Sequence, residues 1–355
     1  MIQLTRSDFQ HAVRTAVAGT LAMYLSKFLG LPEGYWAAIT AIIVLQANLG
    51  AALRESIYRV AATFVGAVVS IPFLAYLGPN LWGFAAAVFI TVVICSSLNL
   101  RSGIRLGATT VAVIVLIGHR GRAWSPALHR FLEVSFGVVV ALVVANLVFP
   151  STAFGKLRGG LSEGYVLLAE LFDRLMRRYK GLPAGPTDEL WKPMTALVHT
   201  NEDLQSQSQY ESSLWSRDHA AVRHMMDDQL CIYHIMKMLE TAVQGTCDNH
   251  FYTALSPEVD VLCDAIGLTL KGIAELPGTK VGAFIPFHFE PALRALEAKA
   301  LDVRRQEISR NFSLQEILHS YTLLVGLENL ARAVSEAQTT AMVLDSRSRR
   351  GRSLV

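Results

Sequence analysis

The segment from Val60 to Leu100 contains no charged residue, and this restricts the fold more than any other feature of the chain. Its 41 residues are about twice the ~20 residues that one helix needs to cross the hydrocarbon core of a bilayer. Gly78-Pro79-Asn80 interrupts the segment with the residue types of a tight turn. The segment is therefore predicted to form two membrane-spanning helices, over 59–77 and 81–98.

Four further spans are predicted from the other apolar runs of the first 150 residues. They are expected over 9–28, 35–50, 104–118 and 130–149. The run at 104–118 is the weakest, because its thirteen consecutive uncharged residues form only about 20 Å of helix. With 52% hydrophobic residues and a mean hydropathy of +0.36, the chain is more apolar than an ordinary soluble protein. The expected fold is an all-α membrane protein with six spans.

The distribution of Lys and Arg predicts the orientation of these spans. The ends that face the cytoplasm in an N-in arrangement hold eight Lys/Arg residues, and the opposite ends hold four. Three of those four lie in the 119–130 segment, which opposes the prediction. The preferred topology places residues 1–150 in the inner, plasma membrane, with both termini in the cytoplasm.

The rest of the chain differs in charge and in periodicity. Residues 1–150 carry a net charge of +6 and the remaining residues carry −3, so nucleic-acid binding is not expected. Apolar residues recur at helical spacing from Leu157 to Tyr179. Residues 151–340 are therefore predicted to form a cytoplasmic helical domain, and 341–355 a disordered basic tail. Its further helices are expected over 188–214, 217–245, 257–275, 290–310 and 313–340.

One group of residues in this domain has metal-ligating side chains. It comprises His219, His224, Asp227, Asp228 and His234. Charged residues at helical spacing are more often a solvated helix face than a metal site, so no metal is expected. No cofactor is predicted, since the chain has no phosphate-binding loop, dinucleotide fingerprint or hydrolase elbow. An enzyme is the least favoured class.

A weak internal repeat relates the two halves of the predicted membrane domain. Arg59 and Gly66 recur 71 residues later as Arg130 and Gly137, and at the same offset Ala41–Leu45 matches Ala112–Leu116. Each copy would hold three spans, so the copies would have opposite orientations in the bilayer. Inverted repeats of this kind are typical of transporters, and chance matching of apolar runs is the alternative.

Arg59 and Arg130 are the main candidates for a functional role. A cation near the start of a span can extend to the lipid headgroups, and that is the alternative for either residue alone. Because a charge inside a bilayer is costly and the two positions are related, we expect them to mark the two mouths of a pathway. There they would attract anions from both sides.

Weaker candidates for the substrate site or pore have polar or aromatic side chains near the ends of the spans. They are Arg14, Arg54, Gln46, Tyr35 and Trp36. The two aromatic residues suit an interfacial belt equally well, and Gln46 could instead bond a neighbouring helix. Glu133, one turn into its predicted span, is the acidic residue best placed to couple transport to a proton.

The second predicted span and the start of the third carry the most specific pattern in the chain. The sequence Tyr-Trp-Ala-Ala-Ile-Thr-Ala-Ile-Ile-Val-Leu-Gln fills 35–46, and Gly50, Arg54, Arg59 and Gly66 follow. Residues 7–150 resemble the membrane domain of the fusaric acid resistance and aromatic acid exporter family, with Ala51-Ala52 where that family often has Thr. The C-terminal half carries no pattern that we assign.

This resemblance implies proton-linked efflux of aromatic carboxylates. It also implies a membrane fold similar to that of plant aluminium-activated malate channels, which are dimers with a basic pore. Many family members have two membrane blocks and this chain has one, so a homodimer in the lipid bilayer is expected. We therefore predict an exporter of organic anions. A passive anion channel and a non-transporting membrane protein whose cytoplasmic helices bind a partner are the alternatives.

Overall fold

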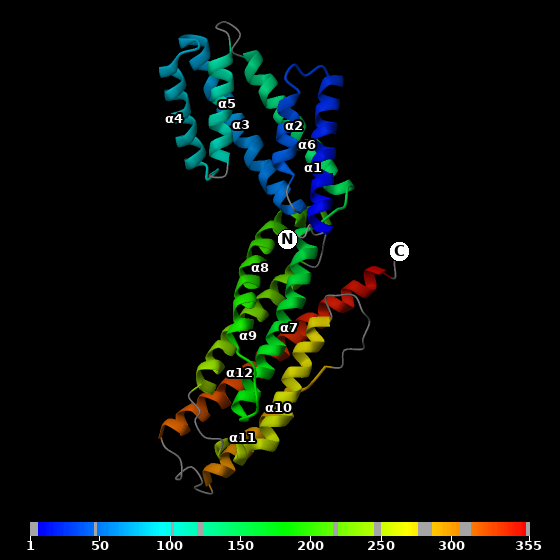
Figure 1. The fold of residues 1–355 in the computed structure, drawn as a ribbon, viewed down its shortest axis with the longest axis vertical. Helices are drawn as coiled ribbons and strands as arrows, with labels where there is room; N and C mark the ends of the chain where they lie inside the picture. Colours follow the sequence, from blue (N-terminus) through cyan, green and yellow to red (C-terminus); the bar gives the residue numbers. More distant parts are fainter. Residues whose placement is uncertain are drawn as a thin grey trace. The chain divides into compact units, whose positions relative to one another are not determined.

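The computed structural model describes residues 6–45, 48–100, 103–118, 124–215, 219–244, 250–275, 286–305 and 314–352. Within these ranges the chain forms twelve helices and no strand, so the prediction of an all-α fold is confirmed for them (Figure 1). The chain divides into two compact units. Unit 1 comprises 1–153 together with 207–214, and unit 2 comprises 154–206 together with 215–355.

Unit 1 is a bundle of helices, and all of them except α1 are apolar. They are α1 (Arg6–Phe28), α2 (Tyr35–Val44), α3 (Leu49–Leu77), α4 (Leu81–Ser97), α5 (Ile104–Ile117) and α6 (Trp124–Leu147). Successive helices run in opposite directions, so α1 and α4 are antiparallel (Figure 1). Helices thus form in all six places where the charge-free runs predicted them. Their boundaries differ in two places, and both differences bear on the site.

The first difference is a break between α2 and α3. The sequence predicted one helix to residue 50 and the next from 59, whereas α2 ends at Val44 and α3 begins at Leu49. Asn48 caps α3, because its side-chain oxygen accepts a hydrogen bond of 2.8 Å from the backbone N–H of Ala51. The boundary between the two predicted helices was placed from the positions of charged residues. Asn48 is polar but uncharged, so this criterion did not detect the cap. The predicted pore residue Gln46 lies outside the described residues.

The second difference is the start of α6, which lies at Trp124 instead of residue 130. Arg130 is therefore well inside the helix, and the earlier start of α3 puts Arg59 about three turns inside its own. Their exposed fractions are only 4% and 3%. Both guanidinium groups are therefore buried inside the bundle. The alternative that these side chains reach out to the lipid headgroups does not hold for either residue.

The packing of unit 1 repeats between its two halves. The third helix of each half packs on the second helix of the other, as α3 on α5 and α6 on α2. The first helix of each half contacts the same two neighbours, α1 with α2 and α6, and α4 with α5 and α3. Repeat-related glycines make the close contacts. A Cβ atom on Gly66 would collide with the carbonyl oxygen of Gly107, and one on Gly137 with that of Ala37.

Helix length follows the same repeat. Within the described residues, α3 and α6 are the two helices long and apolar enough to cross a membrane by length and composition. Their partners α2 and α5 have only 10 and 14 residues. Short second helices in corresponding positions of two inverted halves are a feature of transporter binding sites.

Unit 2 is a second all-helical body. It is built from α7 (Ala153–Tyr179), most of α8 (Asp188–Trp215), α9 (His219–Gln244), α10 (His250–Glu275), α11 (Phe289–Arg305) and α12 (Leu314–Arg352). The apolar stripe of α7 lies in its core, where Leu161, Leu168 and Leu175 have no exposed surface. α9 and α12 pack antiparallel, since Thr340 donates a hydrogen bond to Asp228 while Gly326 lies against Leu239.

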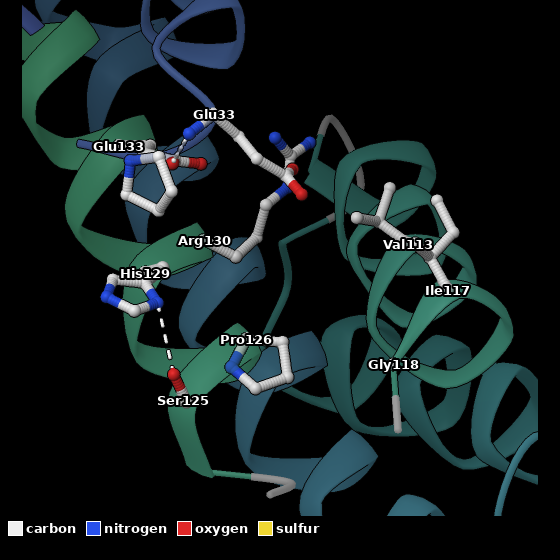
Figure 2. A pocket seen from close by; sticks show the side chains of 10 residues that line it. Glu33, Val113, Ile117, Gly118, Ser125, Pro126, His129, Arg130 and Glu133 are labelled. Carbon is white, nitrogen blue, oxygen red and sulfur yellow. Dashed lines mark hydrogen bonds between the residues drawn. The ribbon is translucent and has the colours of Figure 1, made fainter. Parts of the chain in front are cut away.

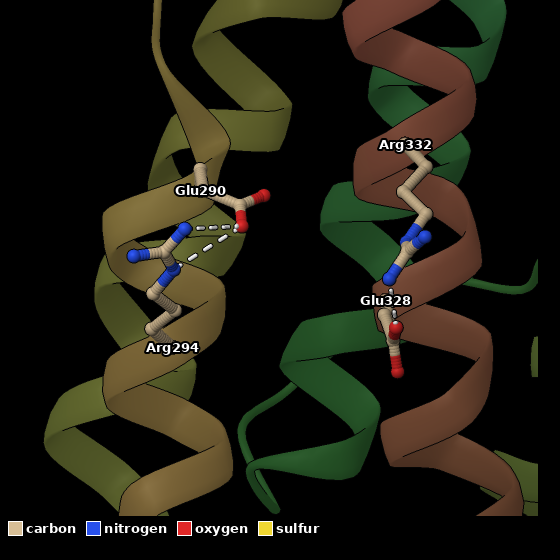
Figure 3. A network of polar contacts seen from close by, with 4 residues as sticks. All are labelled: Glu290, Arg294, Glu328 and Arg332. Carbon is tan, nitrogen blue, oxygen red and sulfur yellow. Dashed lines mark hydrogen bonds and ion pairs between the residues drawn. The ribbon is translucent and has the colours of Figure 1, made fainter.

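Surface charge in unit 2 forms local pairs. Glu290 pairs with Arg294 on α11, and Glu328 with Arg332 on α12, at 3.0 and 2.7 Å (Figure 3). Exposed pairs one turn apart stabilise a helix by about 0.3–0.5 kcal/mol each. Burial of the apolar core therefore contributes far more to unit 2 than these pairs do.

Two predictions for the C-terminal half concern its basic end and its metal-ligating side chains. A disordered tail was expected from residue 341, whereas α12 continues to Arg352. The helix can continue because no Gly or Pro lies between 341 and Gly351. Residues 353–355 lie outside the described residues. Among the residues that are described, no group of three or more His, Cys, Asp or Glu side chains is arranged to hold a metal ion.

Candidate functional site

A cavity of about 560 Å³ opens at the end of unit 1 where α2 and α6 begin and α5 ends (Figure 2). We call this end of unit 1 the cavity end. The residues that line it include Pro32, Glu33, Ile117, His129, Arg130 and Glu133. Its volume lies in the range typical of small-molecule sites, about 300–1,000 Å³. Two of the predicted site residues, Arg130 and Glu133, are thus brought together on one wall.

Arg130 is held against the aromatic face of Trp36. The guanidinium carbon lies 3.5 Å from the centroid of the ring, which is close contact for a cation–π pair. The Nε and Nη1 atoms of Arg130 are buried and have no hydrogen-bond partner in the structure. Buried charged donors without partners are costly, and an anion supplied from the cavity would offset that cost.

Two carboxylates share the wall with this cation. The backbone N–H of Glu33 donates a hydrogen bond of 2.9 Å to the side chain of Glu133, which is 1% exposed. The side chain of Glu33 in turn accepts hydrogen bonds from the indole of Trp36 at 2.9 Å and the hydroxyl of Tyr35 at 3.1 Å. Glu33, just before α2, therefore positions both groups. Its backbone N–H holds the Glu133 side chain, and its carboxylate holds the Trp36 ring beneath Arg130.

Arg59, on α3, also contacts α2, one turn further along that helix than Arg130 does. Its Nε and Nη2 atoms donate to the hydroxyl of Thr40 at 3.3 and 3.1 Å, and Nη1 has no partner. Thr40 and Trp36 are four residues apart, so the two guanidinium groups occupy successive turns of α2, close enough for their charges to interact. We expected one cation at each mouth of a pathway, whereas the residues that hold the two guanidinium groups, Trp36 and Thr40, lie one turn apart.

The remaining candidates lie elsewhere. Arg14 donates from Nη2 to the carbonyl oxygen of Ala145 at 3.2 Å, in the last turn of α6, and its own Nε has no partner. Arg54 lies beside Tyr210, at the end of unit 1 opposite the cavity. Tyr35 is 47% exposed, and it contacts the site through its hydrogen bond to Glu33 and its ring contact with Trp36.

Four polar residues of the site were not identified from the sequence. Glu33, Ser125 and His129 line the cavity, and Thr40 binds Arg59. Glu33 precedes Trp36 by three residues, which is one helical turn, and that spacing was the available signal. The contact between Glu33 and Glu133 joins positions 100 residues apart, and no local pattern reports it.

The sequence model of the fusaric acid resistance protein family matches residues 8–353. The match therefore extends through the C-terminal half, beyond the 7–150 region from which the resemblance was inferred. A UPF0421 protein of Bacillus cereus is 24% identical over 249 residues, 66% of this chain and 69% of that protein. A UPF0421 protein of Staphylococcus haemolyticus is 22% identical over 88% of this chain and 94% of its own length. The inner membrane protein YccS of Escherichia coli is 24% identical over 48% of this chain and 24% of its own length.

Proposed function

Because the chain belongs to the fusaric acid resistance protein family of membrane proteins, we propose that it exports organic anions across the inner membrane. Carboxylates, including aromatic ones, are the class that the site suits. The observation that carries this proposal is the buried guanidinium of Arg130 at the cavity, with two donors that no protein group satisfies. A carboxylate is the natural partner for such a group, since charge-assisted bonds to Arg are strong and directional.

The transport pathway in this proposal follows α2 between the two halves of unit 1. Six spans would cross the bilayer, with the short helices α2 and α5 between α3 and α6. Arg130 from α6 and Arg59 from α3 contact successive turns of α2, at Trp36 and at Thr40, so an anion leaving Arg130 would meet Arg59 one turn away. The cavity end would face outwards, both chain termini and residues 151–340 would lie in the cytoplasm, and two copies would form a homodimer.

Glu133 is the proposed proton-coupling group. It lies at the cavity with Arg130 and, when ionised, competes with a substrate carboxylate for the same cation. Anion binding at Arg130 and the protonation of Glu133 would therefore depend on each other, which is the condition for coupling. A passive channel does not need this carboxylate. A requirement for Glu133 in transport would therefore distinguish a proton-coupled transporter from a channel.

The first test is anion flux through liposomes that contain the purified chain, with a panel of labelled aliphatic and aromatic carboxylates. Arg130→Ala should weaken apparent affinity about ten- to hundredfold, because each charge-assisted hydrogen bond contributes about 1.5–3 kcal/mol. Arg130→Lys should retain part of the affinity, since Lys keeps the charge but loses the planar fork.

Arg105→Ala is the matched control, because Arg105 is an exposed arginine of the same unit, on α5. It should transport like the unmodified chain. Wild-type flux in Arg130→Ala at normal expression would refute the role of the cavity. No flux of any carboxylate through the unmodified chain would move the assignment to a non-transporting membrane protein.

A further inference from the structure

At the end of unit 1 opposite the cavity, a piece of α8 packs against the start of α3. This piece, Gln207–Leu214, belongs to unit 1 although most of α8 belongs to unit 2. We call it the α8 segment. Glu211 is 2% exposed, and one of its carboxylate oxygens accepts hydrogen bonds from the backbone N–H groups of Gly50 and Ala153, at 2.7 and 2.8 Å. These donors lie in the first turns of α3 and α7, where helix dipoles favour a negative charge.

A second contact fixes the α8 segment to the break between α2 and α3. The side-chain amide of Asn48 donates a hydrogen bond of 2.8 Å to the side chain of Gln207, and both residues are buried. The carbonyl of Gln207 lies so close to Gly50 that a Cβ atom there would collide with it. Gly50 is therefore required for this approach, and the segment is anchored at Asn48 and at Gly50.

The α8 segment covers the face of α3 that corresponds, in the internal repeat, to the cavity wall on α6. The offset of 71 residues relates Arg54, Tyr58 and Arg59 to Ser125, His129 and Arg130, which line the cavity at the other end. At this end the corresponding face of α3 is not open, because Tyr210 lies beside Tyr58 and Arg54.

A second layer closes the same place. Gly103, the counterpart of the cavity residue Pro32, packs directly against Tyr58 and Ala62, the counterparts of His129 and Glu133. One end of the repeat is thus a cavity, and the related end is filled by Gly103 and by the α8 segment.

We infer that the α8 segment is a gate that closes the pathway at the end of unit 1 opposite the cavity. This inference rests on the proposed transport function and assigns its regulation to Glu211, Gln207 and Tyr210. The contacts described for the gate are hydrogen bonds to two helix N-termini and to one cap residue. Since α8 continues into residues 188–206 of unit 2, a displacement of that helix withdraws the segment from α3.

The test is thiol labelling of the full-length protein in nanodiscs, where both faces meet a hydrophilic maleimide. Tyr58→Cys reports the gated end and Ser125→Cys the cavity, each in a chain whose native cysteines are replaced by Ala. In Glu211→Ala, which loses two charge-assisted bonds, labelling at position 58 should rise by at least about tenfold, the equilibrium effect of losing one such bond. Labelling at position 125 should not change.

Glu202→Gln, also on α8 but exposed, is the control and should leave both labelling rates unchanged. Gly50→Ala provides a second route, because it pushes the Gln207 carbonyl away while the Glu211 carboxylate remains. It should raise labelling at position 58 in the same way. If both variants remain folded by thermal melting and position 58 stays protected, the gate is refuted.

If Glu211→Ala does not fold, Gly50→Ala and the conservative Glu211→Gln test the gate instead. Glu211→Gln should raise labelling at position 58 less than Gly50→Ala does. The labelling readout is independent of transport. Opening of position 58 without any anion flux would contradict the proposed function and support the gate. Flux with no change in labelling would support the function and contradict the gate.

Discussion

Arg130 is the residue on which the account of the site depends. Its charge is buried at 4% exposure, and the structure gives it an aromatic surface and nearby carboxylates but no hydrogen bond at Nε or Nη1. A purely structural arginine would normally have these donors satisfied by the protein. An arginine that receives an anion during a transport cycle must keep them free.

At this scale the structure predicts that Trp36 and Arg130 act as a unit. Trp36→Ala removes the ring beneath the guanidinium and should weaken binding of a benzoate probe about two- to thirtyfold, the range of a cation–π contact of ~0.5–2 kcal/mol. Trp36→Phe keeps a ring face but loses the indole hydrogen bond to Glu33, so its effect should be smaller.

Titration calorimetry on the purified variants measures this prediction. The double variant Trp36→Ala/Arg130→Ala should bind no more weakly than Arg130→Ala alone, because the ring acts through the guanidinium. Additive losses would mean that Trp36 contacts the ligand independently of Arg130.

At the scale of helices, charge-free runs predicted where helices form but not where they begin. The break at Asn48 and the start of α6 at Trp124 depend on capping and on tertiary packing, which charge counting does not report. The same limit applies to the site. Arg59, Arg130, Trp36 and Glu133 were identified as single residues, but their convergence on α2 follows from a helix of 10 residues that was expected to have 16.

The glycines of the repeat give a prediction for helix packing. Gly66→Ala and Gly137→Ala each place a Cβ atom against the backbone of the facing short helix, so each should destabilise unit 1 by about 1–3 kcal/mol. Gly83→Ala on α4 is the matched control, because its nearest neighbour would lie at 3.5 Å, an ordinary contact. Thermal melting in mild detergent measures all three. Equal melting temperatures for Gly66→Ala, Gly137→Ala and the control would refute the close α3–α5 and α2–α6 contacts.

At the scale of the whole molecule, the family match over 8–353 makes both halves parts of one protein type. Sequence reasoning connected only residues 7–150 with the family, because the C-terminal half consists of ordinary amphipathic helices without a distinctive motif. The structure gives that half one feature that spacing could not predict, which is the packing of Gln207–Leu214 within unit 1. A transport site on α2 and a gate from α8 would make the two halves functionally dependent on each other.

The central claim is that the chain moves organic anions through the cavity at Arg130, driven by protons through Glu133. The most direct measurement is accumulation of labelled benzoate and malate in liposomes under an imposed pH gradient, for the unmodified chain, Glu133→Gln and empty liposomes. The account predicts accumulation above equilibrium with the unmodified chain, and only equilibration with Glu133→Gln, which is permanently neutral. Accumulation in Glu133→Gln equal to that of the unmodified chain, or no difference between the unmodified chain and empty liposomes, would contradict it.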